Sequence, residues 1–406
     1  MTAPGKHLLM ITHRIPYPPD KGDKIRSYNQ LVFLRQNGWR IHLCTFIDDP
    51  EDLRHIVSLK PLCESASFHH IGPVRRAVGM ASALVRGQAL SVGAFYHPKA
   101  LAYVRRVWAN HPVKAIFCFS SPTAAYLFKA GKIAPNCRKV MDLIDVDSDK
   151  WRQYALQRRP PQSWVYRREA ARLAAYEKRI AETFDATLLV SAQEAAFFRR
   201  QVVDSARVHA LPNGVDTAFF HPRTSEKDPV DDNTCSLVFC GMMDYAPNVD
   251  AVVWFANEVM PRLRQKLGAM WFDIVGARPT REVQALGKMA DVKVHGRVAD
   301  VRPFVWNAAI SIAPIRIARG IQNKVLEAMA MGRPVVASEQ AFEGIEAVPG
   351  RDLLVEKAEP TAFCDAITNL WKNRTLSADL GRQARALTEK RYGWDARLAP
   401  LQTLLS

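Results

Sequence analysis

The sequence contains no long apolar run. Hydrophobic residues make up 48% of its 406 residues, but nowhere do the roughly 18 uninterrupted apolar residues of a transmembrane helix occur. The apolar segment LLMIT near the N-terminus is followed at once by His13, Arg14 and three prolines, which is unlike the apolar region of a secretory signal peptide. We therefore expect a protein that neither spans a membrane nor leaves the cell by the standard export route.

Paired cysteines are also lacking. The seven cysteines are scattered, odd in number and include no C-x-x-C pair. This pattern favours a reduced protein of the cytoplasm.

Acidic residues are scarce in the N-terminal half. Residues 1–200 hold 31 basic and 16 acidic residues, a net charge of +15, whereas residues 201–406 hold 25 and 24, a net charge of +1. The N-terminal half is therefore expected to meet an anionic partner. No nucleic-acid reader motif accompanies its basic residues, so we expect no nucleic acid, and an anionic membrane surface or a diphosphate-linked lipid accounts for the same asymmetry.

Residues 71–111 are both basic and amphipathic. Aliphatic and aromatic side chains alternate there with Arg75, Arg76, Arg86, Lys99, Arg105 and Arg106. Such a segment is typical of helices that lie on a membrane surface. It is also typical of ordinary solvated surface helices, whose wet face often carries arginine, and both interpretations stay open at this point.

The second half is organised around residues 308–338, AAISIAPIRIARGIQNKVLEAMAMGRPVVAS. Short apolar runs at Ile310–Ile315 and Pro334–Ala337 have the length of buried strands, and Ile321–Met331 has helical periodicity. Gly332 stands where a C-cap glycine is expected, and a proline follows where a helix cannot resume. The segment therefore predicts a β-α-β unit.

One face of this helix is predicted to pack and another to bind. At 100° per residue, Asn323, Lys324 and Glu327 fall on a different side from the apolar residues. The first N–H groups of a helix lack internal partners and carry partial positive charge, and Gly320 has no Cβ to keep a ligand away from them. Fixed positive charge surrounds the same turn, from Arg316, Arg319 and Lys324. We expect a pyrophosphate there, with Glu327 accepting two ribose hydroxyls.

A less specific interpretation of the same residues is a surface ion pair. Lys324 and Glu327 are spaced i to i+3, and an exposed pair at this spacing has little energetic consequence. The strand, loop and helix context favours the anion site.

The residues GIQNKVLEAMAMGRPVVAS resemble the donor-nucleotide signature of the GT-B glycosyltransferases of the large retaining family 4. The resemblance implies that Glu327 holds the donor ribose. Family members usually carry a second glutamate near the transferred sugar, and its position is taken here by Arg319. Together with THRIPYPPDKGDKIRS and GMMDYAPNVDAV, the segment resembles a subgroup of exopolysaccharide sugar transferases found with PEP-CTERM sorting systems.

Two further loops match the family pattern in part. Gly22 lies in the N-domain glycine loop that faces the donor in the family, although a lone glycine here is also an ordinary turn. Gly241 ends the first strand of the second sheet, and in the turn after it Met242 and Pro247 replace the family's phosphate-binding arginine and lysine. Phosphate neutralisation is therefore expected from Arg316, Arg319 and Lys324.

An acidic cluster follows the apolar run Lys139–Ile144. Asp145 and Asp147 form a D-x-D pair, which coordinates a divalent ion in the other major glycosyltransferase fold. Family 4 enzymes generally work without a metal, so we expect none. The region matches a family loop that often carries a His-Asp element, but no histidine stands there. Asp145 is expected to orient an acceptor hydroxyl or take its proton, and it could equally cap the following helix.

The sequence thus predicts a GT-B fold of two Rossmann-like α/β domains that face each other across a cleft. We place the N-terminal, acceptor and membrane-facing domain at 1–210, a linker at 211–234, the donor domain at 235–385, and a C-terminal helix at 386–406 that packs back toward the N-domain. The catalytic residues are predicted to be Asp145 and Arg319, and the donor-binding residues Gly22, Gly241, Arg316, Gly320, Asn323, Lys324 and Glu327.

The predicted activity is transfer of a hexose from a nucleoside-diphosphate sugar to a lipid-linked or growing saccharide, with retention and without metal, in exopolysaccharide biosynthesis. The enzyme is expected to be peripheral on the inner face of the cytoplasmic membrane. The alternative is a non-catalytic module that binds nucleotide or anionic lipid, which the missing histidine and the substituted cations favour.

Overall fold

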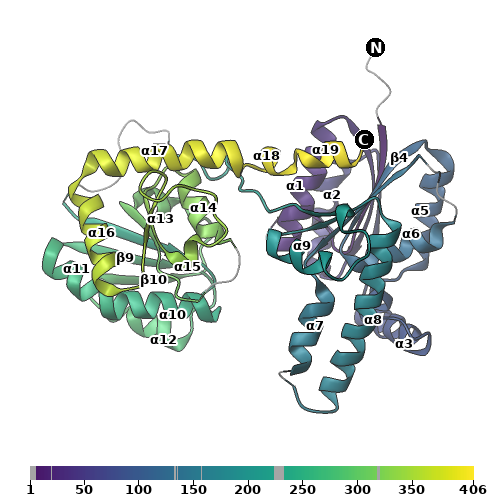
Figure 1. Ribbon diagram of the computed structural model, residues 1–406, viewed down its shortest axis with the longest axis horizontal. Coiled ribbons are helices and arrows are strands. Elements are labelled where there is room, and N and C mark those ends of the chain that lie inside the picture. The colour runs from purple at the N-terminus through teal and green to yellow at the C-terminus, as the bar shows by residue number, and fades with distance from the viewer. Residues whose placement is uncertain are drawn as a thin grey trace. The chain divides into compact units, whose positions relative to one another are not determined.

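The computed structural model describes residues 6–19, 21–131, 134, 136–156, 158–223, 233–317 and 321–406. The chain forms two units, of which the first comprises residues 1–213 and 397–406 and the second residues 214–396. Each unit contains one parallel β-sheet with helices on both of its faces (Figure 1). Of the linker predicted at 211–234, residues 224–232 lie outside the described residues.

The first unit contains seven strands in the order β3-β2-β1-β4-β5-β6-β7, all parallel. The strands are β1 (Lys6–Thr12), β2 (Trp39–Ile47), β3 (Ser65–His70), β4 (Val113–Phe119), β5 (Arg138–Ile144), β6 (Ala186–Leu189) and β7 (Val208–Ala210). Its helices are α1 (Gly22–Gln36), α2 (Ile56–Leu59), α3 (Pro73–Val85), α4 (Leu90–Ala94), α5 (Pro98–Asn110), α6 (Ala124–Ala130), α7 (Asp147–Leu156), α8 (Gln162–Thr183), α9 (Ala192–Arg199) and α19 (Pro400–Leu404).

The second unit contains six parallel strands in the order β10-β9-β8-β11-β12-β13. They are β8 (Cys235–Cys240), β9 (Met270–Val275), β10 (Val292–Gly296), β11 (Ile310–Ala313), β12 (Val335–Ser338) and β13 (Leu354–Glu356). The helices are α10 (Ala246–Trp254), α11 (Met260–Leu267), α12 (Arg281–Leu286), α13 (Arg302–Asn307), α14 (Asn323–Ala330), α15 (Glu339–Phe342), α16 (Pro360–Lys372) and α17 (Arg374–Arg391), and α18 (Trp394–Leu398) crosses into the first unit.

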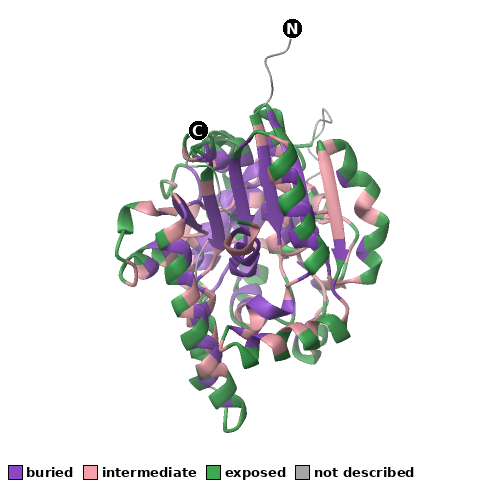
Figure 2. Ribbon diagram, turned by 90° about the vertical axis from the view of Figure 1, so that its right-hand side faces the viewer, coloured by how far each residue is buried: buried purple, intermediate pink, exposed green. Residues whose placement is uncertain are grey.

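The strands are apolar runs because helices cover both faces of each sheet. In β1 the residues from Leu8 to Ile11 are all fully buried, and in β12 so are Val335 to Ala337. Such continuous burial is the pattern of parallel sheets, which do not alternate between a wet and a dry face. Figure 2 shows strands of the first unit buried between helices whose outer faces are exposed.

The β-α-β unit predicted from residues 308–338 is confirmed as β11, α14 and β12. Its first strand is shorter than predicted and ends at Ala313, and its helix begins at Asn323. Gly332 follows the helix with φ +68°, the left-handed conformation that glycine adopts without a steric penalty. At Ser191, which precedes α9, a Ser-x-x-Glu capping box is only half formed. The Ser191 hydroxyl accepts from the Glu194 N–H, but the Glu194 carboxylate accepts from the Val146 N–H instead.

Both sheets reverse their strand order at the first strand of the unit. In the first sheet β1 lies between β2 and β4, and in the second sheet β8 lies between β9 and β11. The connections from the two central neighbours therefore leave in opposite directions and open a crevice at the carboxyl ends of the strands. The turns after β1 and β4, and those after β8 and β11, are thus the positions where each fold favours a ligand.

A buried ion pair ties α1 to the middle of the first sheet. Arg26 and Asp142 are both fully buried, and the Arg26 Nε lies 2.7 Å from the Asp142 Oδ2. Gln30 donates to the same carboxylate oxygen at 2.5 Å, and Arg26 also donates to the Leu211 carbonyl at 2.7 Å. The Asp142 carboxylate is therefore held by side chains of α1. Asp145 and Asp147, which follow β5, do not take part in these contacts.

Candidate active site

Glycine backbones form the floor of the crevice in the second unit. A Cβ on Gly276 would lie 1.6 Å from the Gly241 carbonyl oxygen, and a Cβ on Gly241 would lie 2.7 Å from the Asn248 side chain. The Gly276 N–H donates to the Gly296 carbonyl at 2.9 Å. At the carboxyl ends of β8, β9 and β10 the backbone is therefore not covered by side chains of these glycines, so a flat group can approach it closely.

The Lys324 ammonium lies against this floor. It donates to the Asn248 Oδ1 and to the Gln322 Oε1, both at 3.1 Å, and lies 5.1 Å from the centre of the Phe239 ring. The side chain of Asn248 in turn donates to the Met242 carbonyl at 3.0 Å. A cation from α14 thus reaches the turn after β8, where the sequence lacks the family's own arginine and lysine.

Glu327 follows one turn later on the same helix and is half-buried. No described residue is hydrogen-bonded or ion-paired to its carboxylate. Burial raises the pKa of Glu327 to about 7, against the opposing charge of Lys324, and burial lowers the pKa of Lys324 to about 8. Both pKa values therefore lie close to pH 7 to 8. Because both groups are already partly removed from water, a polar ligand can bind them with little further loss of solvation.

The N-terminus of α14 provides further donors. Asn323 is its first residue and is exposed, and the side chain of the preceding Gln322 does not cap the helix. The first N–H groups and the positive end of the helix dipole belong to the same helix terminus as Lys324, the second residue of α14. Arg319 and Gly320, which the sequence predicts beside them, lie outside the described residues.

Arg316 is held away from this cluster by another partner. Its exposed guanidinium forms a bidentate ion pair with Asp250 of α10, with Nε 2.8 Å from Oδ2, and lies 5.8 Å from the centre of the Trp254 ring. Its charge is thus already balanced in the structure. A role for Arg316 in phosphate binding stays a prediction, and it would require exchange of Asp250 for the phosphate.

In the first unit, Asp145 lies in the loop between β5 and α7. Its carboxylate forms an ion pair of 2.6 Å with Lys150, whose ammonium also lies 3.5 Å from Asp147. Burial raises the pKa of Asp147, and the charge of Lys150 opposes this rise. Among the described residues, no third histidine, cysteine or carboxylate joins Asp145 and Asp147 in a metal-sized cluster.

A histidine that the sequence analysis missed lies near this loop. His13 directly follows β1, its ring stacks on Phe119 at the end of β4, and it is close enough for its positive form to lower the pKa of Asp147. Its Nε2 lies 3.3 Å from the Asp23 carboxylate, which also accepts from Arg14 at 2.6 Å. The signal available in the sequence was its position directly after the apolar segment LLMIT, which forms β1, because the carboxyl ends of the strands face the crevice in this fold.

Gly22 is the first residue of α1, and a Cβ built on it would meet nothing within 4 Å. The isolated molecule therefore does not require glycine at this position. Asp23, which stands where the family has a second glycine, holds His13 and Arg14. Although burial opposes the effect, these two partners bring the pKa of Asp23 well below its ordinary value. The loop is thus shaped by an ionised carboxylate, not by a glycine pair.

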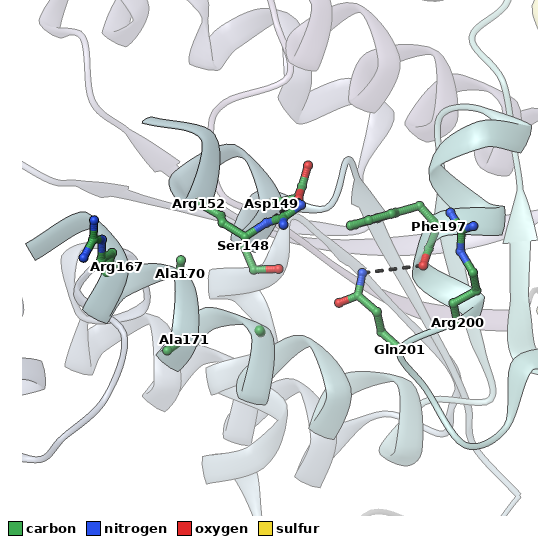
Figure 3. Close-up of a pocket in the computed structure, with 10 residues that line it drawn as sticks. Ser148, Asp149, Arg152, Arg167, Ala170, Ala171, Phe197, Arg200 and Gln201 are labelled. Carbon is green, nitrogen blue, oxygen red and sulfur yellow. Dashed lines mark hydrogen bonds and ion pairs between the residues drawn. The ribbon is translucent and has the colours of Figure 1, made fainter. Parts of the chain in front are cut away.

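A cavity of about 500 Å³ opens beside the start of α7 (Figure 3). Its floor consists of small side chains of α8, and its rim carries three arginines. The lining residues are Ser148, Asp149, Arg152, Arg167, Ala170, Ala171, Ala174, Phe197, Arg200 and Gln201. Asp149 is ion-paired with Arg152, and the Gln201 amide donates to the Phe197 carbonyl at 3.5 Å. The cavity therefore combines an apolar floor with an excess of positive charge.

Comparison with known proteins defines the class. Residues 27–214 match the model of a glycosyl transferase 4-like domain, and residues 234–373 match that of glycosyl transferases group 1. A search of curated protein sequences finds no match. Together with the two parallel sheets, these matches show a GT-B fold. The chain is a glycosyltransferase, which favours the enzyme over the non-catalytic module.

Solved structures share this fold over nearly the whole chain. Sucrose-phosphate synthase from Thermosynechococcus elongatus is 18% identical with a TM-score of 0.67, and the match covers 98% of each chain. HepE from Anabaena, in complex with UDP, is 14% identical with a TM-score of 0.64 and coverage of 98% of this chain and 99% of that one. A variant of S. aureus TarM in complex with UDP is 11% identical with a TM-score of 0.63, covering 99% and 100%.

No helix among the described residues has both the length and the apolar character needed to cross a bilayer. All seven cysteines are free thiols.

Proposed function

We propose that the protein transfers a sugar from a nucleoside-diphosphate sugar to a lipid-linked or growing saccharide in exopolysaccharide biosynthesis, with retention of the anomeric configuration. The observation that carries the donor part is the convergence of Gly241, Lys324 and Glu327 at the strand-order reversal of the second sheet. Retention, membership of family 4 and the PEP-CTERM subgroup rest on the sequence motifs, and the comparisons support the glycosyltransferase class alone.

In the proposed donor complex the pyrophosphate lies at the N-terminus of α14. Lys324 and the first N–H groups of the helix neutralise it, and the Glu327 carboxylate accepts the hydroxyls of the ribose. Arg319 is proposed to stabilise the charge that develops on the leaving diphosphate, with Arg316 as a further cation. Protein side chains then supply the charge that a metal ion supplies in other transferases, so no metal is needed at the donor.

The acceptor is proposed to bind to the first unit. Asp145, held by Lys150 at 2.6 Å, would orient the acceptor hydroxyl or take its proton, and the charge of His13 acts on the neighbouring Asp147. The cavity at the start of α7 would hold the acceptor's anionic group, because Arg152, Arg167 and Arg200 surround an alanine floor. Guanidinium groups bind phosphate in bidentate geometry, as a lipid diphosphate requires.

The same unit carries a surface that fits an anionic membrane. Helix α3 exposes Val74, Val78 and Val85, of which Val85 is 88% exposed, and packs on α4 where Gly79 closely approaches Gly93. The hairpin of α7 and α8 exposes Leu156 and Trp164 at its tip, and it projects from the same end of the unit as α3 (Figure 1).

Arginines flank these apolar residues, namely Arg75 and Arg86 beside α3 and Arg158, Arg159 and Arg167 near the tip. We call the exposed face of α3 together with the hairpin tip the docking face. Apolar insertion combined with basic charge is the chemistry of peripheral binding to acidic lipids, and it supports the proposed location on the inner face of the cytoplasmic membrane.

Calorimetric titration with UDP, GDP, ADP and dTDP tests the donor proposal. HepE and the TarM variant are complexes with UDP, so UDP is the first candidate. Binding of one nucleotide, followed by slow hydrolysis of the matching nucleotide sugar without an acceptor, would support donor transfer. Absence of binding to all four nucleotides would contradict the donor proposal. Binding without any hydrolysis or transfer would favour the alternative of a non-catalytic binding module.

A further inference from the structure

Three histidines meet at the end of the first sheet where its parallel strands begin, opposite the crevice at their carboxyl ends. His7 is in β1, His42 is in β2, and His111 precedes β4, so all three belong to the amino-terminal ends of neighbouring strands. Asp145 and His13 follow the carboxyl ends of the same sheet. The histidine cluster is therefore separate from the proposed active site, and the glycosyltransferase reaction does not account for it.

The ring nitrogens of these residues converge. One nitrogen from each ring lies within 4.8 Å of the other two, and among the described residues this is the sole group of three or more such ligands. The His7 Nδ1 and the His42 Nε2 are 2.9 Å apart, with ring centres at 5.2 Å and planes inclined by 13°. The two rings thus lie edge to edge. The His111 ring is 4.3 Å from His42 and 5.2 Å from His7.

These distances are close to those of a metal centre. Imidazole nitrogens lie about 2.0–2.1 Å from Zn²⁺, which places two ligands of a tetrahedral site about 3.3 Å apart. The His7 and His42 nitrogens, which share a hydrogen bond in the absence of an ion, need to give up its proton and separate by a few tenths of an ångström. His111 needs to turn toward them. Both His7 and His111 are only half-buried, so their rings have room for this change and an ion has a path of entry.

A hydrogen-bonded chain behind His42 fixes the orientation of its ring. The His42 Nδ1 lies 2.7 Å from the Ser65 hydroxyl, which in turn lies 2.7 Å from the buried hydroxyl of Tyr103. When Nδ1 is the protonated nitrogen, Nε2 presents its lone pair to the centre of the cluster. This is the arrangement found around metal-binding histidines, in which a partner on one nitrogen directs the other at the ion.

Arg40 is a cation whose charge acts on the His7 ring, but it has an acidic partner of its own. Arg40, which is paired in register with His7, forms a 2.8 Å ion pair with Glu64, so its charge is largely balanced. We propose that His7, His42 and His111 bind one late first-row divalent ion, such as Zn²⁺, and leave a fourth position for water. Three imidazoles select such ions over Mg²⁺ and Ca²⁺, which prefer oxygen ligands. The ion would join β1, β2 and the segment before β4, and so stabilise the first unit.

The test uses the full chain without a histidine tag. Titration of Zn²⁺ against a chromophoric chelator should show one ion per chain, and His111→Ala should weaken that affinity at least tenfold. The matched control is His70→Ala, which removes an exposed histidine at the opposite edge of the sheet and should bind as the wild type does. Equal affinity in the wild type and in His111→Ala would overturn the proposal.

Two further measurements do not depend on how a variant folds. X-ray absorption on the zinc-loaded wild type should give three nitrogen ligands of imidazole type, and one or none would overturn the site. Added Zn²⁺ should raise the thermal unfolding midpoint of the wild type and of His70→Ala but not that of His111→Ala. The initial rate of sugar transfer should be the same with and without Zn²⁺, because the ion lies at the far edge of the sheet.

Discussion

The Lys324 ammonium of α14 donates a 3.1 Å hydrogen bond to the Asn248 side chain of α10. The contact brings a positive charge close to Met242 in the turn after β8 and to Pro247 at the start of α10, the two positions where the family resemblance implies an arginine and a lysine. Lys324 and Glu327 are proposed to bind the donor together, and burial lowers the pKa of Lys324 to about 8 and raises the pKa of Glu327 to about 7. The first two predictions concern this pair.

Replacement of Glu327 should weaken the donor complex. Glu327→Ala removes a carboxylate that accepts two hydroxyls, and hydrogen bonds to a charged group contribute about 2 to 4 kcal/mol in total. The expected loss in kcat/KM, or in nucleotide affinity measured by calorimetry, is roughly 30-fold to 1000-fold. Glu339→Ala, an exposed glutamate of α15, is the control. Wild-type kinetics in Glu327→Ala would remove the ribose assignment.

The rate should depend on pH through both members of the pair. Glu327 must be ionised to accept hydroxyls, so kcat/KM should fall as pH decreases through about 7 and the carboxylate is protonated. Lys324 must be charged to bind phosphate, so kcat/KM should also fall as pH rises through about 8. The optimum thus lies between these values. Lys324→Arg should shift the alkaline limb upward, since a guanidinium stays charged. A flat profile from pH 6 to 9 would contradict the pair's role.

Chelation should leave sugar transfer intact. The donor phosphate is proposed to be neutralised by side chains and helix N–H groups, so initial rates with EDTA should equal those without it. The thermal midpoint should nevertheless fall if zinc occupies the three-histidine site. Loss of activity in EDTA with recovery on addition of Mn²⁺ would instead make Asp145 and Asp147 metal ligands.

Breaking the buried pair of α1 and β5 should destabilise the first unit. Arg26→Ala leaves the fully buried Asp142 carboxylate without its cation, which costs about 3–5 kcal/mol. Arg40→Ala, which breaks an exposed pair with Glu64, should cost about 0–1 kcal/mol. Native-state hydrogen exchange of β5 amides measures the opening free energy in both variants. Equal protection of the β5 amides from exchange in the two variants would mean that the hydrogen bond from Gln30 is sufficient to stabilise the Asp142 carboxylate.

Membrane binding should depend on the arginines of the docking face. Each basic residue near an acidic leaflet contributes about 1 kcal/mol, so reversal of Arg75, Arg158 and Arg159 to Glu should weaken binding to acidic liposomes on the order of 100-fold or more. Salt at 1 M, where screening shortens to about 3 Å, should release the wild type unless its apolar residues are deeply inserted. Cosedimentation measures both effects.

The matched control reverses three exposed cations of the second unit, Arg262, Lys288 and Lys390, and so changes the net charge equally. This control should retain most of the liposome binding, and neither variant should alter nucleotide affinity in solution. Equal loss in both variants would show that net charge alone attracts the protein. Binding of duplex DNA with the same salt dependence would show generic attraction to anions.

Local pattern in the sequence determined the elements and the fold class. Parallel strands are buried on both faces, so β1, β11 and β12 appear as apolar runs, and the periodicity of residues 321–331 together with Gly332 marks the helix between two of them. The order of these elements, combined with the VLEAMA motif, was sufficient to predict a GT-B glycosyltransferase. The position of Glu327 on a different side of its helix from the apolar residues Val325, Leu326 and Met329 also follows from local periodicity.

The tertiary structure alone decided which charged groups meet. Lys324 contacts Asn248 across 76 positions of sequence, Arg316 pairs with Asp250 instead of standing beside Lys324, and His13 approaches Asp147 from a strand far earlier in the chain. The three histidines at 7, 42 and 111 come together for the same reason. Strand order places distant segments at one end of a sheet, and no local pattern encodes that order, because it depends on how strands and helices far apart in the chain pack together.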